Sequence, residues 1–425
     1  MADIRPFKGI RFNPDKVKDM GRVITPPYDV IDQQEQDRLH KQDLYNIVRL
    51  EYGLTRTGDN DLDNRYTRAA DTLERWLADD VLCPERSAGF YLYEQDFIYN
   101  GRGMSRRGII AALRLELYER RIVLPHELTM KGPKKDRLAL LNATRTNISP
   151  IFTLFPDPED IVDRLFESVT PGEMLFEARE NSGQIHRLWI VTEKGVLDDI
   201  SKYFQDCQLL IADGHHRYET ALQYAGSGSR SKNDGACYVL STIISMKDPG
   251  LLALPTHRLL RGLSEKEEND LWAGLDENFV LLEAGGLAKL DLGKFQLELA
   301  KTAAEKSGFG LFHSGKAYLI QPKFTPGRGD LAVSLLHEQL LDRTDNERSD
   351  FPDQTETPQI SFEHDPSKCL KEVRDSNAGW AFILGPVPVE KIFERSKMGL
   401  VMPRKSTYFY PKLPGGLVLY HMDLS

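Results

Sequence analysis

The sequence contains little cysteine: its 425 residues include only four. Cys83, Cys207, Cys237 and Cys369 are scattered and form no CxxC pair. This excludes a disulfide framework or a zinc ribbon and is typical of reduced cytosolic thiols. The chain also lacks an apolar run approaching the roughly 20 residues of a membrane span, and residues 1–10 show no apolar signal-peptide core. We therefore expect a cytoplasmic protein without a membrane-spanning segment.

Several catalytic motifs are missing as well. The chain has no GxxxxGK[ST] loop, no GxGxxG after a predicted strand and no HExxH pair. It has neither a GxSxG elbow nor the HRD and DFG motifs of protein kinases. These absences argue against a P-loop ATPase, a Rossmann dehydrogenase, a zincin, an α/β-hydrolase and a protein kinase.

Positive charge is not in excess, since the formal net charge is −9. This argues against non-specific binding of nucleic acid, which needs a basic surface, and we expect a small-molecule substrate. The chain is long for a single core. We divide it into a motif-bearing α/β region over residues 1–260 and a C-terminal α/β region over residues 261–425, which contributes a basic strand to the site. The sequence does not specify an oligomeric state.

Strand-like and helix-like patterns alternate irregularly along the chain, which predicts an α+β (mixed α/β) fold. Predicted strands cover residues 90–93, 109–117, 151–155, 188–192, 238–245, 317–321 and 380–384. Predicted helices cover residues 33–44, 63–77, 196–204, 265–275, 331–341 and 389–397. Residues 100–107, 226–235 and 342–357 are predicted loops.

Residues 209–222 are the most informative stretch. The apolar run at 209–212 predicts a buried strand, Asp213-Gly214 marks a turn, and apolar residues then follow at helical spacing until Gly226. His215, His216 and Arg217 would thus lie at an exposed helix N-terminus, where free N–H groups and the helix dipole favour an anion such as phosphate. The structural alternative is an ordinary helix N-terminus, in which Asp213 lies near the cap position and the histidines have no functional role.

Four other polar groups are candidates, each with a structural alternative. Asp29 follows Tyr28 and a rigid Pro-Pro pair, which would hold its carboxylate firmly. His126 and Glu127 offer a base or a metal ligand, or else form a solvated turn. Asp136 predicts a helix cap with an ion pair to Arg137.

The remaining candidates are basic. His257-Arg258 follows an apolar run and suits an anionic substrate, or forms a satisfied structural pair. Lys405 and Lys412 flank an aromatic, hydroxyl-rich segment that suits phosphate binding or base stacking. The alternative for that segment is an alternating strand with a lysine at each end.

Six separated motifs then match one family in order: residues 26–31 (PPYDVI), 126–129 (HELT), 136–138 (DRL), 211–221 (IADGHHRYETA), 255–258 (PTHR) and the 402–412 segment. The chain resembles, from end to end, a bacterial and archaeal family labelled as a domain of unknown function and known by its PPYDVI and ADGHHR signatures. That family is often associated with serine biosynthesis.

The DGHHR element also resembles the second motif of the ParB/sulfiredoxin superfamily, in which a Gly-containing turn and an Arg at a helix start bind nucleotide phosphates. This resemblance covers about 15 residues and implies a ParB/sulfiredoxin-like core within residues 1–260, with additional α/β subdomains. The superfamily includes partition proteins, sulfinic-acid reductases and kinases of free serine. His215 stands in the region where sulfiredoxin needs a cysteine, which argues against a sulfiredoxin reaction.

Together these features favour a small-molecule phosphotransferase, namely a kinase of free L-serine with ATP, ADP or pyrophosphate as donor and Mg²⁺ as cofactor. The residues expected to bind phosphate or substrate are Gly214, His215, His216, Arg217, His257, Arg258, Lys405 and Lys412. Asp213, Glu127 or Asp29 would act as base, with Asp213 favoured; Asp213 and Glu127 are metal candidates, and His126 positions the substrate. The alternatives are a nucleotide-sensing or DNA-associated regulator on a ParB-like core, and a metal-dependent phosphohydrolase that uses the histidines.

Overall fold

The computed structural model describes residues 2–129, 131–168, 174–227, 234–327, 329–342 and 360–424. The chain forms two compact units. Unit 1 comprises Met1–Pro125, Gly132–Leu251 and Pro411–Ser425, and unit 2 comprises His126–Lys131 and Leu252–Tyr410. The chain passes from unit 1 to unit 2 after Leu251, whereas we predicted the boundary at residue 260 from the sequence. Two short segments, His126–Lys131 and Pro411–Ser425, belong to the unit on the other side of that boundary, because their contacts are made there.

Unit 1 is built on a mixed sheet to which nine strands contribute among the described residues, in the order β6-β11-β8-β12-β5-β4-β10-β9, with β1 paired to β5. The strands are β1 (Ile4–Arg5), β4 (Phe90–Tyr99), β5 (Arg102–Arg114), β6 (Val123–Leu124), β8 (Ile151–Phe155), β9 (Met174–Arg179), β10 (Ile185–Val191), β11 (Leu209–Asp213) and β12 (Tyr238–Ser245). Small ladders join β2 (Ile10–Phe12) to β3 (Leu82–Pro84) and β7 (Thr146–Asn147) to β21 (Tyr420–His421). Strand β11 lies between β6 and β8, next to one end of this order, and its residues Leu209–Ala212 are buried. Asp213 is the last residue of the strand and is only partly buried.

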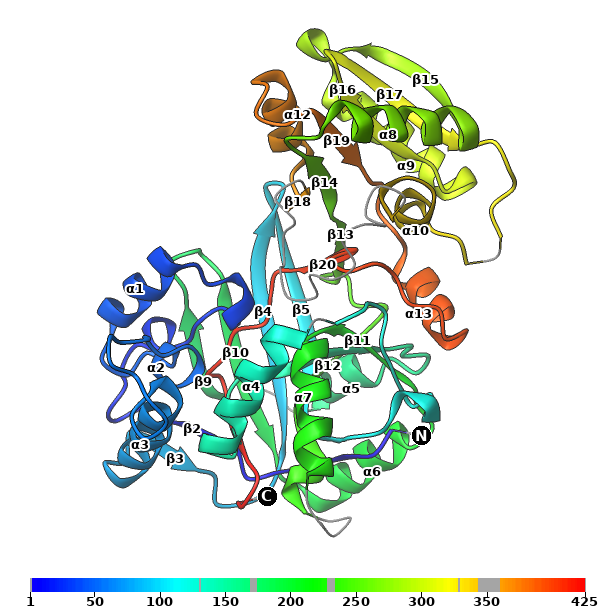
Figure 1. Cartoon of the computed structure of the whole chain (residues 1–425). Coiled ribbons are helices and arrows are strands. Elements are labelled where there is room, and N and C mark those ends of the chain that lie inside the picture. Colours follow the sequence, from blue (N-terminus) through cyan, green and yellow to red (C-terminus); the bar gives the residue numbers. More distant parts are fainter. Residues whose placement is uncertain are drawn as a thin grey trace. The chain divides into compact units, whose positions relative to one another are not determined.

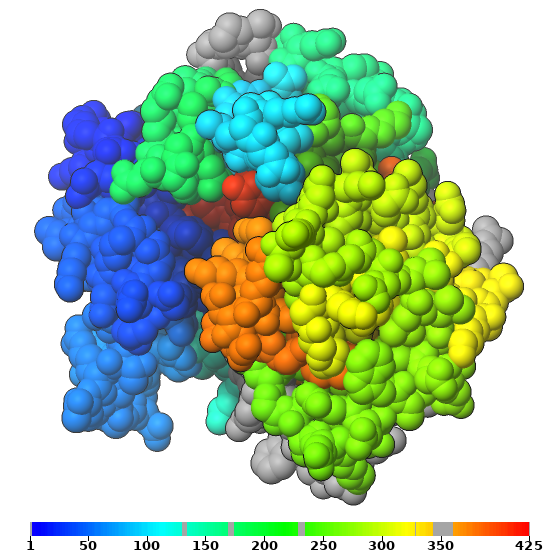
Figure 2. All heavy atoms as spheres, turned by 90° about the horizontal axis from the view of Figure 1, so that it is seen from above, coloured from blue at the N-terminus to red at the C-terminus, as the bar shows by residue number. Residues whose placement is uncertain are grey.

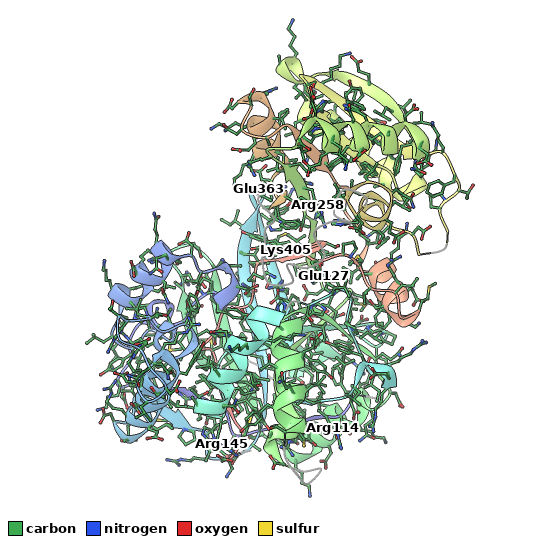
Figure 3. The ribbon with its side chains drawn as sticks, viewed as in Figure 1. Arg114, Glu127, Arg145, Arg258, Glu363 and Lys405 are labelled. Carbon is green, nitrogen blue, oxygen red and sulfur yellow. The ribbon has the colours of Figure 1, made fainter. Side chains whose placement is uncertain are left out.

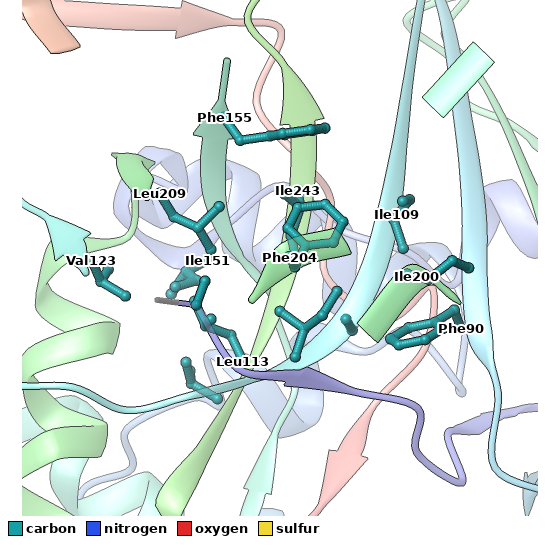
Figure 4. Close-up of a cluster of buried hydrophobic side chains, with 14 of the residues drawn as sticks. Phe90, Ile109, Leu113, Val123, Ile151, Phe155, Ile200, Phe204, Leu209 and Ile243 are labelled. Carbon is teal, nitrogen blue, oxygen red and sulfur yellow. The ribbon is translucent and has the colours of Figure 1, made fainter. Parts of the chain in front are cut away.

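The core of unit 1 lies between this sheet and its helices. Figure 4 shows apolar side chains from several strands and a helix converging, including Phe90, Ile151, Phe204 and Leu209. All four are fully buried. The continuous apolar run of β11 is therefore explained by burial on both sides of the strand.

The helices of unit 1 form two groups. One group is α1 (Gln33–Gln42), α2 (Val48–Glu51) and α3 (Arg65–Ala78), whose atoms, in blue, lie together in Figure 2. The other is α4 (Lys131–Thr144), α5 (Ile161–Ser168), α6 (Lys194–Phe204) and α7 (His215–Gly226), of which α4 and α7 lie side by side in Figure 1. Helix α7 follows directly from β11, as the sequence predicted.

The predicted loop at 100–107 is wrong. Strands β4 and β5 form one long antiparallel hairpin in which Tyr99 pairs with Arg102. Asn100 and Gly101 alone make the turn, with φ angles of 49° and 76°. An Asn-Gly pair at positive φ is the preferred two-residue hairpin turn, and residues 102–107 of the predicted loop lie on β5.

Unit 2 contains a six-stranded sheet within the described residues, in the order β15-β17-β16-β19-β14-β18. Its strands are β14 (His257–Leu260), β15 (Phe279–Gly286), β16 (Phe309–His313), β17 (Lys316–Pro322), β18 (Ile360–Glu363) and β19 (Trp380–Ile383), while β13 (Leu252–Pro255) pairs with β20 (Thr407–Tyr410). The helices are α8 (Glu265–Asn278), α9 (Leu292–Lys306), α10 (Ala332–Leu336), α12 (Pro366–Arg374) and α13 (Val389–Lys397). Side chains of α9 and α12 pack on the sheet in an apolar core that includes Phe295, Leu299 and Leu370.

The predicted mixed α/β fold is confirmed, with several sheets. The predicted helix at 331–341 is present as α10 followed by a π-helical segment, His337–Leu341. The predicted loops at 226–235 and 342–357 lie largely outside the described residues. Among the residues that are described, no helix is both long and apolar enough to cross a membrane.

Candidate functional site

The turn between β11 and α7 requires glycine. Gly214 is the N-cap of α7 and has a φ of 89°, in the left-handed region. A Cβ at this position would lie 3.1 Å from Arg217 Nε and 3.1 Å from Ile151 Cγ2. Glycine therefore satisfies both the backbone conformation and the close approach of Arg217, which folds back over the turn.

Asp213 is shared by two cations. Its Oδ2 accepts a hydrogen bond from Arg217 Nη2 at 2.8 Å, and its Oδ1 accepts one from Lys412 Nζ. The side chains of Asp213 and Arg217 are only 13% and 12% exposed, so the prediction of an exposed site is wrong for these two residues. Burial opposes ionisation of Asp213, but Lys412 and Arg217 outweigh it and hold the pKa of this carboxyl below its ordinary value. The two cations share this carboxylate beside the α7 N-terminus.

The two histidines of the motif have different environments. His215 is buried, with 9% of its surface exposed, whereas His216 is half-buried. Burial lowers the pKa of His216, and Asp29 and Glu219 partly oppose this effect. At neutral pH His216 is therefore a neutral imidazole that carries one donor and one acceptor.

Asp29 lies on a single turn of 3-10 helix, Tyr28–Val30, with Pro27 as its N-cap. The preceding Tyr28 ring is held by Arg137, whose guanidinium lies 4.0 Å from the ring centroid. Arg137 in turn donates to Glu51 Oε1 at 3.1 Å. Asp29 itself is exposed and accepts no hydrogen bond from the described residues, so its carboxylate is accessible while the neighbouring Tyr28 is fixed.

Asp136 does not cap a helix as predicted, because α4 already begins at Lys131. Its carboxylate instead pairs with Arg65 and Arg137 and accepts a hydrogen bond from Tyr66 Oη at 2.7 Å. The predicted ion pair with Arg137 is therefore confirmed. This network anchors α3 to α4 and supports the Tyr28 turn.

A cavity of about 50 Å³ lies beside Arg217 within unit 1, lined by Glu51, Arg137, Asn147, Ser149 and Arg217 among others. A volume of this size holds a few water molecules and is far below that of a nucleotide pocket. His216 and Asp29 do not line this cavity, and Asp29 is exposed.

Glu127 belongs to unit 2 and organises a loop there. Its two carboxylate oxygens accept the main-chain N–H groups of Lys405, Ser406 and Thr407 at 3.0, 2.9 and 2.9 Å. It also accepts the Thr407 hydroxyl at 3.1 Å, and His126 Nε2 contacts that hydroxyl at 2.8 Å. A carboxylate with this many donors is a structural anchor for the 403–407 loop. Figure 3 shows Glu127 and Lys405 close together.

Arg258 is completely buried in unit 2 and donates to the main-chain carbonyls of Thr256 and Arg404. Burial lowers its pKa to about 10, so it stays charged at neutral pH. Its guanidinium lies 5.3 Å from the Phe362 ring, and Lys405 Nζ lies 4.9 Å from the same ring. Phe362 therefore holds both predicted cations by cation–π contact.

His257 is buried beside Arg258. Its Nδ1 accepts the main-chain N–H of Leu384 at 3.1 Å. Burial lowers the pKa of His257 to about 3, so the imidazole is neutral at physiological pH and its Nδ1 is an acceptor.

The predicted site residues thus fall into two groups. Unit 1 holds Asp29, Asp213, Gly214, His215, His216, Arg217 and Lys412, and unit 2 holds His126, Glu127, His257, Arg258 and Lys405. The lysines at the two ends of β20 belong to different units because the chain returns to unit 1 at Pro411.

Sequence reasoning missed Phe362, Gln95 and Arg106. An aromatic residue in a strand gives no sign that two cations will stack on it, so no local signal identifies Phe362. Gln95 and Arg106 have polar neighbours in the sequence and show no apolar alternation, but recognition of the Asn-Gly turn would have placed both on the strands of a hairpin.

The family model described as "Protein of unknown function (DUF1015)" matches residues 4–344. No curated protein matches the sequence. Among solved structures, a conserved hypothetical protein from Pyrococcus furiosus is 15% identical, with a TM-score of 0.40 over 75% of this chain and 97% of that one. A free serine kinase in complex with AMP is 13% identical, with a TM-score of 0.42 over 75% and 93%. C-terminally truncated SbnI from Staphylococcus aureus is 10% identical, with a TM-score of 0.35 over 72% and 85%.

Proposed function

This chain belongs to the DUF1015 family, and we propose that it is a small-molecule kinase that transfers a phosphoryl group from ATP, ADP or pyrophosphate to the hydroxyl of free L-serine. The observation that supports this proposal is the arrangement around the α7 N-terminus. There, two cations share Asp213, and a separate exposed carboxylate, Asp29, belongs to the same unit. The ParB/sulfiredoxin-like character of the core and the serine acceptor come from the sequence resemblances and are part of the proposal.

Phosphoryl transfer needs positioning and charge neutralisation more than covalent catalysis. Free N–H groups of the first turn of α7 would bind phosphate oxygens, with Arg217 and Lys412 supplying positive charge. Asp213 fixes both cations, so it acts in this proposal as a positioning residue. The substrate-binding role predicted for His257, Arg258 and Lys405 stays a prediction, as does the positioning role predicted for His126. Within unit 2, Arg258 and Glu127 hold main-chain groups of the 403–407 loop.

Asp29 takes the role of base in this proposal. Asp213 is engaged by Lys412 and Arg217, and Glu127 by three main-chain N–H groups, so neither is free to accept a proton. Asp29 would accept the hydroxyl proton of serine as its oxygen bonds to phosphorus. The bridging P–O bond of the donor breaks, and the leaving AMP, ADP or phosphate takes the electron pair.

The described residues offer Mg²⁺ only a few protein ligands at this site. Among the described residues, no group of three or more His, Cys, Asp or Glu side chains is arranged to hold a metal ion. Mg²⁺ commonly uses one or two carboxylates together with substrate phosphates, and Asp29 offers one such oxygen donor, whereas Asp213 and Glu127 are already engaged. A bound Mg²⁺ would neutralise charge on the donor phosphates.

The proposal is tested by phosphorus NMR of the purified protein with Mg²⁺ and L-serine, in separate samples with ATP, ADP and pyrophosphate. We expect an O-phosphoserine signal in one of them and none when serine is omitted. Donor hydrolysis that does not depend on serine would indicate a phosphohydrolase. Nucleotide binding without turnover in any sample of folded protein would overturn the proposal in favour of a regulator.

A further inference from the structure

Arg106 is buried in the middle of the β4–β5 hairpin and contacts the chain where it returns from unit 2. Its Nη2 donates to the main-chain oxygen of Pro411 at 2.7 Å and to Gln95 Oε1 at 2.5 Å. Arg106 and Gln95 are both completely buried. The guanidinium also lies 5.0 Å from the centroid of the Phe152 ring. The Arg106 side chain is therefore restrained by this cation–π contact as well as by its hydrogen bonds.

Gln95 holds the next peptide of the same segment. Its Nε2 donates to the main-chain oxygen of Lys412 at 3.4 Å and to Gln184 Oε1 at 2.8 Å. Pro411 and Lys412 lie outside any strand, so no sheet ladder sets their register. Two buried side chains of one hairpin therefore fix two successive carbonyls of this returning segment.

The side chain of Lys412 then reaches Asp213, the carboxylate that also holds Arg217. The contacts form one path from the hairpin, through the main chain of Pro411 and Lys412, to the turn before α7. A shift of either carbonyl would move the ammonium of Lys412, because these two carbonyls belong to the peptide groups on either side of the Lys412 Cα. All of these residues belong to unit 1.

We propose that Arg106 and Gln95 are positioning residues that set Lys412 on Asp213 by holding the main chain of Pro411 and Lys412. The proposal rests on the proposed function only where Lys412 is taken to face the donor phosphates. It assigns a role to a hairpin that carries none of the family's signature motifs.

The test uses Gln95→Met, Arg106→Lys and Lys412→Met, with Gln184→Met as the matched control. Arg106→Lys keeps the charge but replaces the planar guanidinium, whose Nη2 donates to both Gln95 and Pro411, with a flexible ammonium. Gln184→Met removes a hydrogen bond to Gln95 but none to the returning segment. The first readout is the crystal structure of each variant. We expect Lys412 Nζ to leave Asp213 in Gln95→Met and Arg106→Lys and to stay in Gln184→Met.

The second readout is a double-mutant cycle on the KM for the phosphoryl donor, measured with the intact chain. Gln95→Met should raise this KM roughly tenfold, as expected for the loss of about one hydrogen bond, and should have no further effect when Lys412 is already Met. Arg106→Lys should behave in the same way. Additive effects in the cycle, or an unmoved Lys412 in the crystal structures of both variants, would overturn the proposal. If the wild-type protein shows no turnover with any donor, the proposed function fails, but the crystal structures still decide the positioning role.

Discussion

Lys412 donates a hydrogen bond to Oδ1 of Asp213 although 199 residues separate the two in the chain. Arg217 donates to the other oxygen of the same carboxylate at 2.8 Å. Asp213 thus lies between two cations, and the proposed function gives it the role of positioning them while another group accepts the proton. The experiments below separate these two roles.

Asp213→Asn should be strongly destabilising. The substitution leaves two largely buried cations without their shared carboxylate, and removal of one partner from such a group costs about 3 kcal/mol or more. Urea unfolding of Asp213→Asn and of the double variant Asp213→Asn/Lys412→Met measures this. The double variant should recover part of the loss, and a double variant that is less stable than the single one would contradict the arrangement.

Asp29→Asn should lower kcat for O-phosphoserine formation by roughly 10²–10⁴-fold, the usual contribution of a general base. The fold should be unaffected because Asp29 is exposed. Asp32→Asn is the matched control, since Asp32 caps α1 by accepting the N–H of Glu35 and asparagine caps equally well. Equal losses of activity in both variants would refute a specific role for Asp29.

Glu127→Gln should loosen the 403–407 loop. A glutamine offers one acceptor oxygen where Glu127 offers two, and hydrogen bonds to a charged acceptor contribute roughly 1.5–3 kcal/mol. Hydrogen exchange should therefore accelerate at the amides of Lys405, Ser406 and Thr407. Unchanged exchange together with abolished turnover would instead assign Glu127 as the base.

Gly214→Ala should cost more than Gly101→Ala, although both glycines have positive φ, of 89° and 76°. The left-handed conformation alone costs an alanine about 1–2 kcal/mol. A Cβ at Gly101 meets nothing within 4 Å, whereas one at Gly214 crowds Arg217. Thermal unfolding should show the difference, and only Gly214→Ala should impair turnover; matching effects would mean that Arg217 does not need this close approach.

His257 should make the stability of unit 2 fall in mild acid. Burial lowers its pKa to about 3, from 6.5. Between these two values the unfolded chain binds a proton that the folded protein does not, so stability decreases as the pH falls through this window. His257→Asn keeps an acceptor for the N–H of Leu384 but does not titrate. The stability advantage of the wild type over this variant should shrink by about 2 kcal/mol between pH 7.5 and pH 5, and a constant difference would show that His257 titrates normally.

The sequence predicted the local part of the site well. The strand, turn and helix from Leu209 to Gly226 depend on an apolar run, a glycine and helical spacing, which are all contained in one short window. The structure confirms β11, the turn at Gly214 and α7. It also confirms most of the predicted strands and helices in both units, because their patterns are equally local.

The long-range part could not be predicted in the same way. The sequence around Lys412 contains no pattern that predicts its contact with Asp213. The sequence around Glu127 likewise contains no pattern that predicts its hydrogen bond to the main chain at Lys405. Both contacts depend on where the chain crosses between units. The predicted exposure of Arg217 was wrong for a similar reason, since its guanidinium donates to the main-chain oxygen of Pro150, 67 residues earlier in the chain.

The return of the chain at Pro411 also has a consequence during protein synthesis. Unit 1 needs Pro411–Ser425, which include buried residues such as Leu419 and Tyr420, yet the ribosome makes them only after the whole of unit 2. Domains usually fold in the order in which they are translated. Here the core of unit 1 becomes complete only after the whole of unit 2 has been synthesised, although most of unit 1 emerges first.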